Sequence, residues 1–219
     1  GTVIATVAEL ITINAATSGT VVLNPQTIGT PPPGTASELA AAFDGITSLT
    51  GGLTIAGTDP ATVAELMTIN AATSGTVVLN AGTNGANLSG SAVDLVAAFD
   101  GITSHTGGLT IAGTDPATVA QLITINAATS GTVVLNAETN GALRSGSAVD
   151  LAAAFDGITS HTGGLTITGT GIATFAELTV INTATNGTVV LNAETTAENY
   201  TDTAANLAMA FDGITTSAA

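Results

Sequence analysis

The sequence has 219 residues and no cysteine or tryptophan, with one Lys or Arg against 16 Asp and Glu. The net charge of −15 argues against nucleic acid as a partner, because phosphate binding depends on clustered Lys and Arg. Disulfide bonds and cysteine-ligated zinc are excluded, and no apolar run reaches the ~18 residues of a membrane span, so we expect no membrane insertion.

The chain repeats itself every 56 residues. The string Ala-Thr-Val-Ala-Glu-Leu at residues 5–10 returns with small changes at 61–66, 117–122 and 173–178. Ala-Phe-Asp-Gly-Ile at residues 42–46 returns at 98–102, 154–158 and 210–214. The sequence therefore predicts one domain over residues 1–219, built from four repeats at about 5–60, 61–116, 117–172 and 173–219, with residues 1–4 as a partial strand.

Each repeat divides into halves of 29 and 27 residues, here called half a and half b. Every half begins with Ser or Thr, followed three residues later by an acid or an amide and then by Leu, which is typical of a capping box at a helix start. The predicted starts are Thr6, Thr35, Thr62, Ser91, Thr118, Ser147, Thr174 and Thr203.

The apolar spacing after each start predicts a helix and then a strand. Leu39, Ala42, Phe43 and Ile46 keep the i, i+3, i+4, i+7 spacing of one helix face. After a glycine turn, short strands are expected at residues 53–55 in half b and at residues 21–23 in half a, with alternate side chains on one face.

A helix and a strand of about 28 residues cannot bury their own apolar faces, so neighbouring halves must stack. The sequence predicts an α/β repeat solenoid of eight half-repeats, with a parallel sheet on one side and short helices on the other. A second topology, with the strands of halves a and b in separate sheets, stays open.

One set of acids invites a metal hypothesis. Asp44, Asp100, Asp156 and Asp212 recur before glycine near helix ends, where a carboxylate opposes the helix dipole. An Asp-Gly turn explains them most simply. Calcium is the alternative, but it needs 6–8 oxygen ligands and no EF-hand loop is present. We therefore expect no cofactor, with these four residues as the calcium candidates.

The sequence also argues against catalysis. His105 and His161 occupy a position that is Leu49 in the first repeat, so that position is not designed as a metal ligand or general base. No nucleophile elbow or P-loop occurs. Nearly identical halves do not supply the distinct converging groups of an active site, and we expect no enzyme.

The segment between strand a and helix b keeps its length but changes its sequence between repeats. It covers residues 25–34, 81–90, 137–146 and 193–202. Loops both tolerate drift and carry recognition, so both interpretations stay open. The candidate partner residues are Pro31, Pro32, Pro33, Asn87, Arg144 and Tyr200.

The first and last units are as apolar as the interior ones, whereas monomeric solenoids close their ends with polar caps. Residues 1–4 read as a strand that a neighbouring copy could add to its own last helix. We therefore expect head-to-tail association of copies, or neighbouring repeats of a longer chain, through Gly1, Thr2, Val3, Ile4, Phe211 and Ile214.

The strings at residues 5–21 and 90–102 resemble the Ala/Thr/Gly-rich tandem repeats of very large extracellular proteins of cyanobacteria and other aquatic bacteria. The resemblance covers essentially the whole chain and implies a surface-layer, adhesin-stalk or filament component, located outside the cell or on its surface. Any export signal is expected to have been removed or to lie upstream. We expect an extracellular structural spacer or filament subunit. The alternative is a binding module of a bacterial surface adhesin, whose variable segments hold a protein or glycan.

Overall fold

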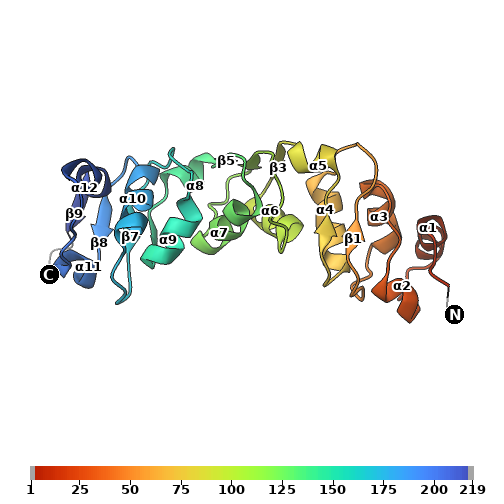
Figure 1. Cartoon of the computed structure of the whole chain (residues 1–219). Helices are drawn as coiled ribbons and strands as arrows, with labels where there is room; N and C mark the ends of the chain where they lie inside the picture. Colours follow the sequence, from red (N-terminus) through yellow and green to blue (C-terminus); the bar gives the residue numbers. More distant parts are fainter. Residues whose placement is uncertain (1–2, 217–219) are drawn as a thin grey trace. The chain divides into compact units, whose positions relative to one another are not determined.

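The computed structural model describes residues 3–216, with side chains as far as Ile214. It is a mixed α/β protein of short helices and short, open parallel sheets (Figure 1). Two compact units make up the chain. Unit 1 runs to Leu109 and includes Ala128–Gly131, and unit 2 comprises Thr110–Ala127 and the residues from Thr132 onward.

All eight predicted helices are present, and each begins one residue after the predicted Ser or Thr. In half a they are α1 (Val7–Ala15), α4 (Val63–Ala72), α7 (Val119–Ala128) and α10 (Phe175–Ala184). In half b they are α3 (Ala36–Phe43), α6 (Ala92–Phe99), α9 (Ala148–Phe155) and α12 (Ala204–Phe211).

The capping box is complete where Thr is followed by Glu or Gln. The Glu65 amide donates to the Thr62 hydroxyl over 3.2 Å, and the Thr62 amide donates back to the Glu65 carboxylate over 2.8 Å. The prediction is wrong for the return bond at Ser91, whose hydroxyl, rather than its amide, donates to Asp94. The Asp side chain is one methylene shorter than Glu and does not reach the amide.

The predicted apolar face of the half-b helices is confirmed. Leu39, Ala42 and Phe43 are 0% exposed, and Ile46 is 5% exposed. In unit 1, α1 packs on α3, α3 on α4 and α4 on α6, and in unit 2 α9 packs on α10 and α10 on α12 (Figure 1). Within each unit, the half-a and half-b helices that follow one another along the chain therefore lie side by side.

The strands are β1 (Leu53–Thr54), β2 (Val77–Val78), β3 (Leu88–Gly90), β4 (Leu109–Ile111), β5 (Val133–Val134), β6 (Arg144–Gly146), β7 (Leu165–Ile167), β8 (Val189–Leu191) and β9 (Ile214–Thr216). In unit 1, β1 pairs in parallel with β2. In unit 2, β6, β7, β8 and β9 pair in that order, all in parallel. Strands of halves a and b therefore share one sheet in each unit, and the topology with separate sheets is wrong.

Each repeat also contains a short helix that the sequence pattern does not predict, just after the position of the half-a strand. These helices are α2 (Pro25–Gly29), α5 (Ala81–Gly85), α8 (Ala137–Gly141) and α11 (Ala193–Ala197). Five residues are too few to show an apolar period. The preceding asparagine, such as Asn80, caps each one. The strands β3 and β6 also lie in the segment that was expected to be a variable loop.

The predicted strand at residues 21–23 is absent. Its equivalent β2 pairs with β1, with Val77 opposite Leu53. The matching partner of Val21 would precede residue 1, so the strand has nothing to pair with in this chain.

The prediction of a partial strand at residues 1–4 is also wrong for the residues that the structure describes. Val3 lies in a bend and Ile4 has no regular structure, whereas Gly1 and Thr2 lie outside the described residues. Residues 1–5 align with the turn at residues 57–61, not with the strand before it. At the other end, Ile214 begins a strand, β9, that was not predicted.

Candidate functional site

One asparagine in the last turn of each half-a helix binds the end of the next half-b helix. The Asn70 side-chain amide donates to the carbonyl oxygens of Ala97 and Asp100, over 3.0 and 3.1 Å. Asn14, Asn126 and Asn182 make equivalent bonds 27 residues ahead, to Ala41, Ala153 and Met209. Carbonyls at a helix C-terminus lack partners within the helix, so the asparagine caps its neighbour and joins the two halves.

A second asparagine holds the short helix against the segment that leads into the half-a helix. The Asn80 side chain accepts from the Thr83 amide over 2.7 Å and donates to the Asp59 carbonyl over 3.0 Å. Thr83 is 0% exposed, and its hydroxyl accepts from the Ala61 amide over 2.8 Å. The same pairs recur at Asn24 and Thr27, Asn136 and Thr139, and Asn192 and Thr195.

A threonine after each of three half-a helices makes the third contact. The Thr73 hydroxyl donates to the Gly51 carbonyl over 2.7 Å, and Thr129 and Thr185 do the same to Gly107 and Gly163. The backbones approach closely here, since a Cβ added at Gly107 would clash with the Ala86 carbonyl. The first set joins the two halves of one repeat, and the other two join a half a to the half b before it. We call all three sets the inter-repeat hydrogen bonds.

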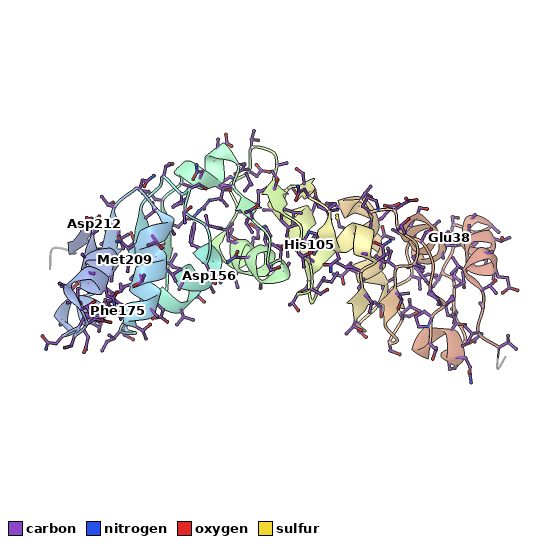
Figure 2. All side chains as sticks on the ribbon, turned by 45° about the horizontal axis from the view of Figure 1, so that its top comes forward. Glu38, His105, Asp156, Phe175, Met209 and Asp212 are labelled. Atoms are coloured by element: carbon purple, nitrogen blue, oxygen red, sulfur yellow. The ribbon has the colours of Figure 1, made fainter. Side chains whose placement is uncertain are left out.

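The four calcium candidates lie apart from one another, at the C-terminal ends of the half-b helices. Asp44, Asp100, Asp156 and Asp212 all have exposed side chains, and Figure 2 labels the last two. The glycine after each has a φ of 71–75°, so it makes the left-handed turn that ends the helix. Among the described residues, no three His, Cys, Asp or Glu side chains are grouped to hold a metal. The expectation of no cofactor, with calcium at these residues as the alternative, stays a prediction.

Three of the candidate partner residues share one position. Pro32, Arg144 and Tyr200 are equivalent to Leu88, and all four are half-buried. The Tyr200 ring packs edge-on against Phe211 at 5.2 Å between centroids, and its hydroxyl donates to the Ala173 carbonyl.

The remaining candidate partner residues are less enclosed. Pro31 is half-buried and Pro33 is exposed. Asn87 is exposed, and its side chain accepts from the Gly108 amide over 2.8 Å. The segment thus varies both at exposed positions and at the half-buried position of Leu88, and the binding-module alternative stays a prediction.

The face of α1 away from α3 is uncovered in the described chain. Ile13 is 48% exposed, whereas its equivalents Ile69, Ile125 and Ile181 are 0% exposed. Together with Val3 and Ile4, Ile13 lines a hollow of about 590 Å³.

The face of α12 away from α10 is open in the same way. Ala204 is exposed, whereas its equivalents Ala36, Ala92 and Ala148 are only 6–7% exposed. Phe211 is partly exposed, whereas its equivalents Phe43, Phe99 and Phe155 are buried. Phe211, Tyr200 and Ile214 line a hollow of about 440 Å³. Both ends therefore carry side chains that the equivalent interior repeats bury.

The chain matches no protein-family model, no curated protein and no solved structure. None of the helices in the described part of the chain has the length and apolar character needed to cross a bilayer.

Proposed function

We propose that this chain is an extracellular structural protein, a solenoid spacer or filament subunit whose two ends bind further repeats of the same kind. The observation that carries the proposal is the recurrence of the inter-repeat hydrogen bonds at constant sequence separations along the chain. Thr27, Thr83, Thr139 and Thr195 each accept from an amide 22 residues earlier. Such contacts join each half to the next along the chain, as in other repeat proteins, where each unit contacts its neighbours.

The helix contacts support a one-dimensional arrangement. In unit 1 a half-b helix, α3, packs between two half-a helices, α1 and α4. In unit 2 the half-a helix α10 packs between α9 and α12. Repeats that contact only their neighbours along the chain make a solenoid, and stability then accumulates through these interfaces.

The two uncovered faces are of complementary type. Inside the chain a half-b helix packs on the half-a helix that follows it, as α3 does on α4 and α9 on α10. The uncovered face of α12 belongs to a half-b helix, and that of α1 belongs to a half-a helix. The α12 of one copy and the α1 of the next therefore offer the pair that the interior already uses. A heterologous contact of this kind builds open filaments, and the same pairing joins repeats within a longer chain.

The charge supports a location outside the cell. With a net charge of −15 and one basic residue, copies repel one another at low ionic strength. Salt screens such repulsion beyond about 10 Å at 0.1 M, so a saline medium favours association. Nothing in this role requires a catalytic group or a cofactor.

The test is sedimentation of the chain at physiological salt, from micromolar to millimolar concentration. We expect the average mass to rise with concentration, and electron microscopy to show linear particles. Ile13→Glu disables the α1 face and Ala204→Glu the α12 face, and both side chains are already exposed in the single chain, so folding is preserved. Val93→Glu is the control, because Val93 is 64% exposed and its equivalent Val149 is 63% exposed, so this position lies on neither face.

The variants distinguish head-to-tail stacking from other association. Each end variant alone should remain monomeric, because each lacks one half of the contact. A one-to-one mixture of the two should form dimers and stop there, since only one intact pair of faces remains. Wild-type monomers over the whole concentration range, or association of a single end variant, would contradict the proposal.

A further inference from the structure

His105 and His161 lie at the junction where one repeat meets the next, as Leu49 does in the first repeat. Each forms a parallel bridge with a threonine 24 residues ahead, His105 with Thr129 and His161 with Thr185. The His105 amide donates to the Ala128 carbonyl, and the His105 carbonyl accepts from the Ser130 amide over 3.0 Å. The backbone of each histidine thus forms part of the contact between repeats. Figure 2 labels His105.

The histidine side chains are enclosed in apolar surroundings. His105 is 1% exposed and His161 is 0% exposed. The rings pack tilted against Phe99 and Phe155, at centroid distances of 5.0 and 4.8 Å. Within the described chain, neither nitrogen of either ring has a hydrogen bond of ordinary length and angle. A buried imidazolium would therefore lack water and an acceptor in good hydrogen-bonding geometry, so the neutral form of these rings is favoured in the folded protein.

No carboxylate among the groups that act on the rings compensates a positive charge. Near His161 the charged group is the Arg144 guanidinium on β6, whose Nε and Nη2 themselves lack partners within the described chain. The His161 ring also packs against Phe155 on α9 and is acted on by the Ala142 backbone after α8, and its backbone pairs with Ala184 and Thr185 at the end of α10.

Burial, and secondarily Arg144, lowers the pKa of His161 to about 4, and the Ala142 backbone acts in the opposite direction. Around His105 the arginine is replaced by Leu88, its equivalent in the preceding repeat. Burial again lowers the pKa of His105, and the Ala86 backbone opposes this.

We propose that His105 and His161 make their two repeat junctions open in mild acid, while Leu49 keeps the first junction insensitive to pH. Opening exposes each ring to water, where it takes up the proton that the closed junction excludes. The proposal concerns the inside of the chain and does not depend on association between copies.

The direction of the pH dependence of junction opening follows from proton linkage. An exposed histidine titrates near pH 6.5, so below that pH the open state binds a proton that the closed state does not. Stability is therefore full above about pH 6.5 and is lost as the pH falls toward 4. For His161 this shifts the equilibrium toward the open state about 20-fold at pH 5 relative to pH 7, and about 30-fold relative to pH 7.5.

Amide hydrogen exchange, corrected for intrinsic rates, tests the proposal in the wild-type chain. The Ser74, Ser130 and Asn186 amides donate to the carbonyls of Leu49, His105 and His161, over 3.0, 3.0 and 2.9 Å, so they report on the three junctions in one molecule. Between pH 7.5 and pH 5 we expect Ser130 and Asn186 to lose protection, by about 30-fold at Asn186, while Ser74 keeps it. Equal loss at all three amides would overturn the proposal.

His105→Leu and His161→Leu provide matched variants, because the chain itself places Leu at position 49, where it is 1% exposed. Each should abolish the acid-induced loss at its own junction and leave the other unchanged. Each variant keeps every carboxylate of the wild-type chain. Carboxylate titration therefore affects variant and wild type equally and cancels when the two are compared. Arg144→Leu copies the surroundings of His105 and should make the loss at Asn186 smaller, because it raises the pKa of His161 in the closed junction toward that of the open one.

Nuclear magnetic resonance of the histidine rings keeps the test decisive if a variant fails to fold. Both rings should stay mainly neutral in the folded wild-type protein as the pH falls through 6.5, although protection already falls there, because the protonated open state is still a minor population. Rings that titrate near pH 6.5 while protection at Ser130 and Asn186 is maintained would refute the proposal.

Discussion

At the scale of single residues, this chain is held together by short polar side chains that bind backbone atoms. Thr83 and Asn80 are buried because each satisfies a backbone group of another segment. The acids of the capping boxes act in the same way within one helix turn. In the first repeat the Thr35 amide and hydroxyl both donate to the Glu38 carboxylate, and these two bonds lower the pKa of Glu38. The contribution of such a cap is present above the ordinary Glu pKa and is lost as the pH falls through the lowered value.

Thr118→Ala removes the hydroxyl that accepts from the Gln121 amide over 3.2 Å. We expect the free energy of unfolding to fall by about 1 kcal/mol, as for other lost N-caps. Because the partner is Gln121 rather than Glu, the loss should be the same at pH 7 and pH 4. Urea denaturation measures it. Thr124→Ala is the control in the same helix, because the Thr124 hydroxyl binds only the Ala120 carbonyl one turn earlier, and it should change stability by less than about 0.5 kcal/mol.

At the scale of helices and strands, each half-b helix depends on a side chain from the preceding half-a helix. Asn70 on α4 caps α6 in unit 1, and Asn126 on α7 caps α9 in unit 2. The glycine turn after α6 at Gly101 reverses the chain, and the asparagine satisfies the carbonyls that the turn leaves free. The two halves of a repeat are therefore joined by directed bonds as well as by apolar packing.

Asn70→Ala should lower the free energy of unfolding by about 1–3 kcal/mol, because the Ala97 and Asp100 carbonyls lose their donor. Asn70→Asp keeps the shape of the side chain but places a carboxylate oxygen against both carbonyl oxygens. It should therefore lower the free energy of unfolding by more than Asn70→Ala does. Chemical denaturation ranks the two. Thr68→Ala, whose hydroxyl binds only its own helix at Ala64, should be close to neutral, and an equal loss there would remove the special role of Asn70.

The helix starts could be predicted because their information is local. Thr62 and Glu65 lie within one turn, and their pairing needs no other part of the chain. The role of Asn70 could not be predicted, because its acceptors lie 27 and 30 residues away and a single helical asparagine has no distinctive pattern. The burial of His105 and His161 was missed for a similar reason, although Leu49 at the same position was the available indication.

At the scale of the whole molecule, charge and the repeated acids decide the expected response to ions. The net charge of −15 is spread over carboxylates along the whole sequence, so added salt of any kind reduces repulsion. A specific metal site would need several oxygens at one point. Each repeat instead has a single such aspartate, exposed at the end of its half-b helix: Asp44, Asp100, Asp156 and Asp212.

A chelator should therefore leave the melting temperature unchanged. Calcium and magnesium at equal ionic strength should raise it by the same small amount, because both act by screening. Thermal unfolding followed by circular dichroism measures this. An increase of many degrees with calcium alone, lost in Asp100→Asn, would identify these residues as ligands.

The constant sequence separation of the inter-repeat hydrogen bonds also constrains how the gene can change. The segment at residues 81–90 differs from its equivalents at many positions, yet its length is the same in all four repeats, and so is the 27-residue separation between each capping asparagine and the carbonyl that it binds. Excising or duplicating a whole 56-residue unit preserves every donor and acceptor distance along the chain. Substitution is thus permitted within a unit while length varies only in whole units, so unequal recombination can lengthen or shorten such a gene without unfolding its product.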